Sequence, residues 1–116
     1  MTDIDAVLII RKEILKRSSL SFETILKKHR IQRYQLGLYY ITTSNKTICE
    51  ALNIPIEAGC RYKARLEENH NLVTSIDDFK CPYTKEFVKF LSTNPAEFER
   101  LQKSDTNQLN LFENGN

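Results

Sequence analysis

The sequence predicts a mainly helical fold with one small β-hairpin, and three observations support this prediction. Residues 44–69 read as two short helices in which apolar side chains recur every four residues, so each helix has one apolar face. A tight turn divides them, because Asn53 tolerates a positive φ and Pro55 restarts the chain with a helical φ. The segment Leu72 to Ile76 then alternates as a strand does. The shared core of the helix pair is predicted to contain Ile48, Leu52, Ile54, Ala58, Tyr62 and Leu66.

Two helices are predicted at the start of the chain. Thr2 or Asp3 can cap a helix that runs to about Arg17, and Ser21 can cap a shorter helix that runs to about His29. The apolar side of the first helix is predicted to carry Ile4, Val7, Leu8, Ile14 and Leu15.

The segment from Tyr34 to Ile41 is apolar, but its local signals conflict. Gly37 and the paired tyrosines leave both helix and strand open. The position of this segment directly before the helix pair favours a helix that supports the other two.

A short hairpin is predicted after the helix pair. The strand over Leu72 to Ile76 is expected to turn at Asp77-Asp78 and to return over Phe79 to Cys81. Pro82 is then expected to open another helix, with an apolar side formed by Phe87, Phe90 and Leu91.

The C-terminal part is predicted to hold one more helix and a polar tail. Asn94-Pro95-Ala96-Glu97 supplies a cap, a first-turn proline and an acidic third position, which begin a helix through Leu101. Residues 102–116 are polar and without periodicity, so they are expected to be a disordered tail. Residues 1–101 are therefore predicted to form a single domain.

Composition favours a cytoplasmic protein without a cofactor. The chain has 116 residues, of which 41% are hydrophobic and 28% charged, and no apolar run is long enough for a membrane span or a secretory signal. The three cysteines and two histidines have no metal-ligand spacing, so no metal site is predicted. No phosphate-binding glycine loop, carboxylate pair or nucleophile with a base is evident, and an enzyme is not expected.

The stretch from Ser44 to Val73, SNKTICEALNIPIEAGCRYKARLEENHNLV, resembles the bacterial winged helix-turn-helix DNA-binding regulators. It matches their patterns T/S-N-K-x-[IL]-[AC]-x-x-L-[GN]-I and R-x-x-x-L-E-E-x-x-L-[VI]. The resemblance implies a winged helix-turn-helix core, with residues 56–69 as the recognition helix. It also implies which residues contact DNA. Those near bases would be Glu57, Cys60, Arg61 and Arg65, and Lys63 would lie near a phosphate.

One position departs from the family pattern. Gly59 stands where these regulators usually have a buried Val or Ile. Two explanations are open: Ala58 takes over the packing role, or the helix lies closer than usual to its neighbour. The small Cys49 is expected where the two helices cross.

The distribution of charge is compatible with binding to DNA. Residues 1–76 hold 12 Lys and Arg against 8 Asp and Glu, whereas residues 77–116 hold 5 against 7. A second helix-turn-helix over Ser21 to Tyr40, with Arg33 and Gln35 contacting bases, is an alternative that Gly37 weakens. A further basic group could follow the phosphates or could simply be solvated, namely Arg11, Lys12, Lys16, Arg17, Lys27, Lys28, Arg30 and Arg33.

The tail contains the pentapeptide Gln108-Leu109-Asn110-Leu111-Phe112. Its three large apolar side chains have no core to serve, which indicates a pocket on a partner or a fold-back onto the domain. The pentapeptide resembles the bacterial sliding-clamp-binding motif Q-L-[SDN]-L-F. By that resemblance Gln108 would hydrogen-bond at the clamp groove, while Leu109, Leu111 and Phe112 would fill its apolar subsites.

Two functions follow as expectations. The leading one is a sequence-specific DNA-binding protein that binds double-stranded DNA, either a transcriptional regulator or an accessory factor of replication or of a mobile element. The alternative is a non-enzymatic adaptor that the clamp motif recruits to replicating DNA. No membrane partner is expected, and a homodimer through the terminal helices is compatible with the sequence.

Overall fold

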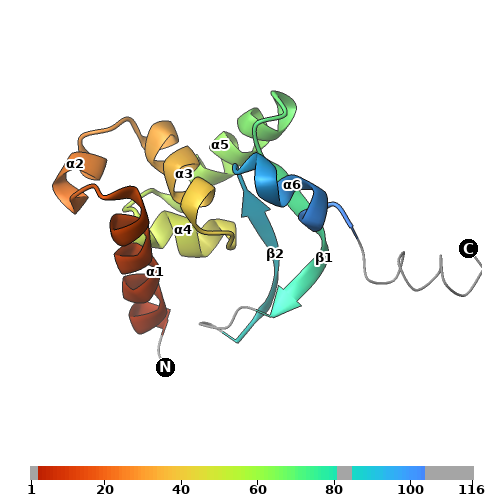
Figure 1. Cartoon of the computed structure of the whole chain (residues 1–116), viewed down its shortest axis with the longest axis horizontal. Coiled ribbons are helices and arrows are strands. Elements are labelled where there is room, and N and C mark those ends of the chain that lie inside the picture. The colour runs from red at the N-terminus through yellow and green to blue at the C-terminus, as the bar shows by residue number, and fades with distance from the viewer. Residues whose placement is uncertain (1–2, 81–84, 104–116) are drawn as a thin grey trace, which may run out of the picture.

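The computed structural model describes residues 3–80 and 85–103. These residues form six helices and one antiparallel two-stranded sheet, which confirms the predicted fold class (Figure 1). The elements in chain order are α1 (Asp3–Ser18), α2 (Phe22–Leu26), α3 (Arg30–Tyr40), α4 (Asn45–Ala51), α5 (Ile56–Glu68), β1 (Val73–Lys80), β2 (Phe87–Ser92) and α6 (Pro95–Leu101). In the described part of the chain, no helix has the length and apolarity that a membrane crossing requires.

Side-chain caps start the short helices. Ser21 Oγ accepts a hydrogen bond from the Thr24 N–H at 3.2 Å, and Asn94 Oδ1 accepts one from the Ala96 N–H at 3.0 Å. These caps satisfy amide groups that have no partner inside the helix. Both predicted start points, for α2 and for α6, are therefore confirmed.

The ambiguous segment before the helix pair is helical, as α3. Gly37 lies in its middle, where a Cβ atom would stand 2.5 Å from Leu52 Cδ1 and 2.7 Å from Ile48 Cδ1. The glycine therefore permits a close approach of α3 to α4, which offsets its low helix propensity.

The core lies where α1 and α3 pack on α4 and α5 (Figure 1). Five of the six predicted residues of the helix pair are buried, and Tyr62 is half-buried at the edge of the core. On α1 the prediction was wrong for Leu8, which is 45% exposed, whereas Ala6 and Ile10 are fully buried. The Ile4 side chain lies outside the described part of the structure.

The hairpin is longer than predicted. The prediction of a helix from Pro82 is wrong over Phe87–Ser92, which form a strand. β1 continues through Asp77-Asp78 to Lys80, and β2 pairs with it, Lys80 standing opposite Phe87. Apolar residues at 87, 90 and 91 also fit helical spacing, so pairing with β1 decides between the two forms. Residues 81–84, including Cys81 and Pro82, lie outside the described residues.

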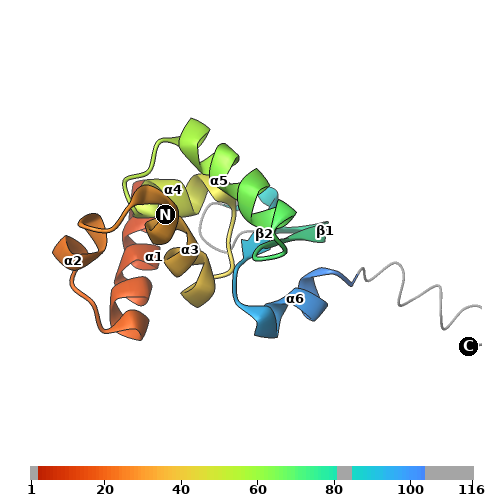
Figure 2. The ribbon, with the colours of Figure 1, turned by 90° about the horizontal axis from the view of Figure 1, so that it is seen from above.

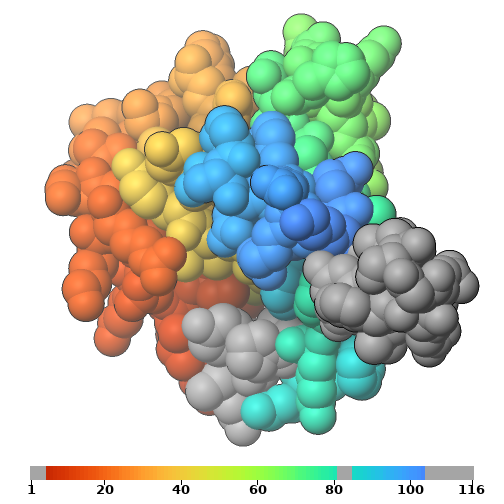
Figure 3. Space-filling model, turned by 45° about the vertical axis from the view of Figure 1, so that its right-hand side comes forward, coloured from red at the N-terminus to blue at the C-terminus, as the bar shows by residue number. Residues whose placement is uncertain are grey.

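A β-bridge attaches the hairpin to the helices. The Thr43 N–H donates to the Leu91 carbonyl at 3.3 Å, and the Leu91 N–H donates to the Thr43 carbonyl at 2.8 Å. This bridge places the connection between α3 and α4 beside β2, while α6 lies on the other side of the molecule from α5 (Figure 2). In the space-filling view α6 occupies the centre of the visible face, where it packs on the hairpin (Figure 3).

Candidate nucleic-acid interface

The turn between α4 and α5 has the predicted construction. Asn53 adopts a φ of 57°, the Ile54 N–H donates to the Cys49 carbonyl at 2.8 Å, and Pro55 caps α5 with a φ of −58°. Ile54 is only 4% exposed and closes the turn from inside. Arg33 of α3 also holds this turn, because its Nη1 donates to the Leu52 carbonyl at 3.0 Å.

The crossing of α4 and α5 explains the unusual glycine. Gly59 is buried, and a Cβ atom there would overlap Cys49 Sγ and stand 2.9 Å from Asn45 Oδ1. The two helices therefore lie closer than a Val or Ile would permit. Ala58 is also buried, at 2% exposure, so both features that the sequence left open are present.

A buried polar contact fixes the start of α4. The Tyr34 hydroxyl donates to Asn45 Oδ1 at 2.7 Å, and the Tyr34 ring meets the Tyr62 ring edge-on at 6.0 Å. Burial, together with the nearby Cys49, raises the pKa of Tyr34 well above its ordinary value. The hydroxyl therefore stays protonated and keeps its role as a donor.

The outward side of α5 carries most of the predicted DNA-contacting residues. Glu57, Cys60, Arg61 and Arg65 are all exposed, and Ala64 lies exposed among them. Lys63 differs, because it is only partly exposed and pairs with Glu67 at 3.6 Å. Two small side chains therefore lie on a surface that also carries two arginines.

The start of α4 adjoins this surface. Asn45 Nδ2 donates to Cys60 Sγ at 3.6 Å, and the neighbouring Lys46 is exposed. Sequence reasoning did not include Lys46 among the candidate residues. Its position beside α5 depends on the crossing of the two helices and has no local sequence signal.

The hairpin adds further cations. Lys80 and Lys85 are exposed, whereas Lys89 pairs with Asp78 at 3.1 Å and donates to the Ile76 carbonyl. Lys89 is therefore engaged within the hairpin itself, whereas the side chains of Lys80 and Lys85 are open to solvent.

Three arginines of the predicted basic group are engaged within the fold. Arg11 Nε donates to the Ala51 carbonyl at 2.8 Å, and Arg17 Nη1 donates to the Tyr40 carbonyl at 2.8 Å. Arg33 holds the turn described above. In Figure 2, α1 and α2 lie on the side of the molecule opposite the hairpin. Backbone carbonyls of the fold therefore hold these three guanidinium groups.

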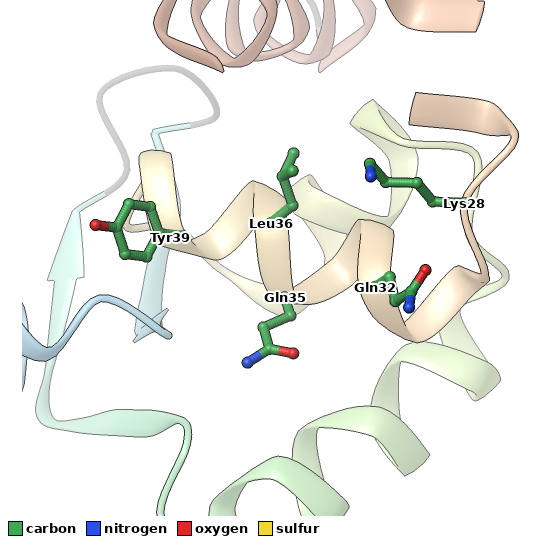
Figure 4. Close-up of a pocket in the computed structure, with 5 residues that line it drawn as sticks. All are labelled: Lys28, Gln32, Gln35, Leu36 and Tyr39. Carbon is green, nitrogen blue, oxygen red and sulfur yellow. The ribbon is translucent and has the colours of Figure 1, made fainter. Parts of the chain in front are cut away.

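The alternative helix-turn-helix over residues 21–40 has two helices, α2 and α3. Of its two predicted base-contacting residues, only one has an exposed side chain. The Arg33 guanidinium is committed to backbone carbonyls, whereas Gln35 is exposed. Gln35 borders a shallow hollow of about 350 Å³ on the outer side of α3, shown in Figure 4. The other residues that line it are Lys28, Gln32, Leu36 and Tyr39.

The described residues offer little for metal binding or for thiol chemistry. Within 3–80 and 85–103, no three His, Cys, Asp or Glu side chains are grouped so that they could hold a metal ion. Burial raises the pKa of Cys49 to about 12, so this thiol is neutral at physiological pH.

The pentapeptide over 108–112, with Gln108, Leu109, Leu111 and Phe112, lies outside the described residues. No protein-family model, curated protein or solved structure matches the chain.

Proposed function

We propose that this chain is a sequence-specific DNA-binding protein that inserts α5 into the major groove. The observation that carries the proposal is the contrast between the two sides of α5. One side is held against α4 through Gly59, and the other exposes Cys60 and Ala64 together with Arg61 and Arg65. An α-helix fits the major groove, and a rigidly held helix keeps its side chains at fixed distances from base edges.

The exposed side chains can contact bases and phosphates in different ways. Arg61 and Arg65 can each form two hydrogen bonds to guanine, and Glu57 can accept from cytosine. The small Cys60 and Ala64 permit the helix backbone to approach the bases. Phosphate contacts would come from the exposed lysines at the start of α4 and on the hairpin, namely Lys46, Lys80 and Lys85. Lys63 is less suited to this role because Glu67 neutralises it.

The test is binding to genomic DNA fragments by a variant with Arg61→Ala and Arg65→Ala. We expect a loss of about 2–5 kcal/mol in binding free energy, from roughly 1–3 kcal/mol for each good base contact. The matched control carries Arg100→Ala and Lys103→Ala, which remove the same charge from the exposed surface of α6. Equal affinity of wild type and the α5 variant, with unchanged circular dichroism, would remove α5 from the DNA interface.

We further propose that the protein is cytoplasmic, is not an enzyme and needs no cofactor. Its process would be transcriptional regulation, replication or the maintenance of a mobile element, and it could act as a homodimer. Steep dependence of DNA affinity on salt is expected for a protein that neutralises several phosphates. An affinity that does not change with salt would instead favour the adaptor described next.

The second candidate is an adaptor that binds the bacterial sliding clamp through Gln108 to Phe112, and the complete sequence match to the clamp motif favours it. A peptide that orders on binding should have roughly micromolar affinity, because the entropy lost on ordering offsets much of the apolar contact. Leu111→Ala with Phe112→Ala should abolish capture of the clamp and leave the melting temperature unchanged. A clear fall in melting temperature would show that these residues pack on their own domain.

A further inference from the structure

The middle of the chain has an unusual charge pattern that the proposed role of α5 does not use. Residues 24–49 contain five Lys and Arg and not one Asp or Glu. This segment includes the end of α2, all of α3 and most of α4. A basic segment that contains no carboxylate of its own attracts polyanions.

The outer side of α3 gives this segment an exposed surface with specific chemistry. Gln32, Gln35, Leu36 and Tyr39 follow one another at helical spacing and line the hollow together with Lys28 (Figure 4). From Gln32 to Tyr39 the helix rises roughly 10 Å, at about 1.5 Å per residue. That length suits one or two extended nucleotides.

Tyr39 supplies an exposed aromatic ring. Its side chain is 48% exposed, and its ring stands edge-on to Tyr40 at 5.1 Å with an interplanar angle of 79°. This neighbour restricts the orientation of the Tyr39 ring and leaves part of it open to solvent. The hollow has this ring at one end, Lys28 at the other and the two glutamine amides along its length (Figure 4), which offers stacking, hydrogen bonds to a base edge and a contact to phosphate.

We infer that the outer side of α3 binds an unpaired stretch of nucleic acid. One base stacks on Tyr39, the amides of Gln32 and Gln35 contact the edge of that base, and Lys28 contacts an adjacent phosphate. The surface contains no residue of α5, so this binding is separate from the proposed insertion of α5 into a duplex.

The chemistry of the hollow distinguishes an unpaired strand from other polyanions. A duplex keeps the faces of its bases stacked and offers no base to Tyr39. An acidic peptide would satisfy Lys28, and its backbone could pair with the two glutamine amides, but a carboxylate side chain offers no flat face to the Tyr39 ring. An unpaired nucleotide provides an anion, a base edge and an aromatic face within the length of the hollow.

The experiment measures fluorescence anisotropy of short labelled oligonucleotides, single-stranded DNA and RNA in parallel, with the full chain. We expect Tyr39→Ala to weaken single-strand binding roughly 5- to 150-fold, the equivalent of one stacked base. Tyr39→Phe should retain most of the affinity because it keeps the ring. Lys28→Ala should reduce the salt dependence of binding by about 0.7 in the logarithmic slope, as expected for one lost phosphate contact on a single strand.

Two controls separate this surface from α5 and from general charge. Lys103→Ala, which removes a cation from the end of α6, should leave single-strand affinity unchanged. The double variant Arg61→Ala with Arg65→Ala should retain single-strand binding even if it loses duplex binding. The proposal fails if neither DNA nor RNA oligonucleotides bind, if Tyr39→Ala binds as wild type does, or if the α5 variant alone loses the single strand. An acidic peptide that binds with equal affinity would also overturn it.

Discussion

Gly59 and Cys49 meet where α5 crosses α4, and no Cβ atom fits between them. The crossing distance of the two helices therefore depends on a residue without a side chain facing a small one. Because α5 carries the candidate DNA-contacting residues on its other side, this contact also sets where Arg61 and Arg65 stand relative to Lys46. A change at the crossing should alter stability and DNA binding together.

Gly59→Ala should destabilise the protein despite the better helix propensity of alanine. Overpacking a close contact costs about 1–3 kcal/mol, against a gain of up to about 1 kcal/mol from replacing glycine in a helix. Urea unfolding would measure the difference. The double variant Gly59→Ala with Cys49→Ala should recover part of the loss, because the alanine at 49 removes the sulfur that the new methyl group would overlap. Additive effects of the two substitutions would show that the two residues do not touch.

Arg11 should contribute to stability more than to DNA binding. Its Nε donates to the Ala51 carbonyl, and its guanidinium lies 4.2 Å from the centre of the Phe22 ring, so it ties α1 to α4 and α2. Arg11→Ala should cost about 1–3 kcal/mol of unfolding free energy, the usual range for a lost hydrogen bond from a charged group. Lys12→Ala, at the exposed neighbour, should remain within about 0.5 kcal/mol of wild type. A similar loss in both variants would contradict this anchoring role.

Local signals predicted the parts of the fold that depend on neighbouring residues. Ser21 and Asn94 cap their helices as expected, because a capping side chain reaches only two or three residues along the chain. The segment Phe87–Ser92 was misassigned because its apolar spacing fits a helix as well as a strand. Only the pairing with β1 and the bridge to Thr43 separate these alternatives, and both contacts are distant in sequence.

In the candidate site, too, features of a single helix were predictable from the sequence, whereas contacts between distant segments were not. The predicted apolar face of residues 56–69 does not include Arg61 or Arg65, and both are exposed, because this periodicity depends on one helix alone. The use of Arg11 and Arg33 within the fold could not be predicted, since their carbonyl acceptors lie 40 and 19 residues away. Lys46 was missed for the same reason, because only the crossing of α4 and α5 brings its neighbour Asn45 into contact with Cys60.

Ser75→Ala should loosen the hairpin. The register shifts between Thr74 and Asp78, and within this bulge Ser75 Oγ accepts from the Phe90 N–H at 2.9 Å and donates to the Asp77 carbonyl at 2.7 Å. Ser75 is 3% exposed, so its loss removes the acceptor of the part-buried Phe90 N–H, at a cost of about 1–3 kcal/mol. Hydrogen exchange at the Phe90 amide should accelerate. Unchanged protection of that amide would mean that the bulge does not depend on the serine hydroxyl.

Cys49 should make the fold sensitive to alkaline pH. Burial, followed by the nearby Cys60, raises its pKa from 9.0 to about 12 in the folded protein. Between these two values the folded chain retains a proton that the unfolded chain releases, so stability falls as the pH rises, by at most about 1.4 kcal/mol per pH unit. Below pH 9 this contribution is fully present. The unfolding free energy measured with urea across pH 8 to 11 should therefore fall less steeply for Cys49→Ala than for wild type. Parallel curves for the two proteins would show that Cys49 ionises as readily in the folded chain as in the unfolded one.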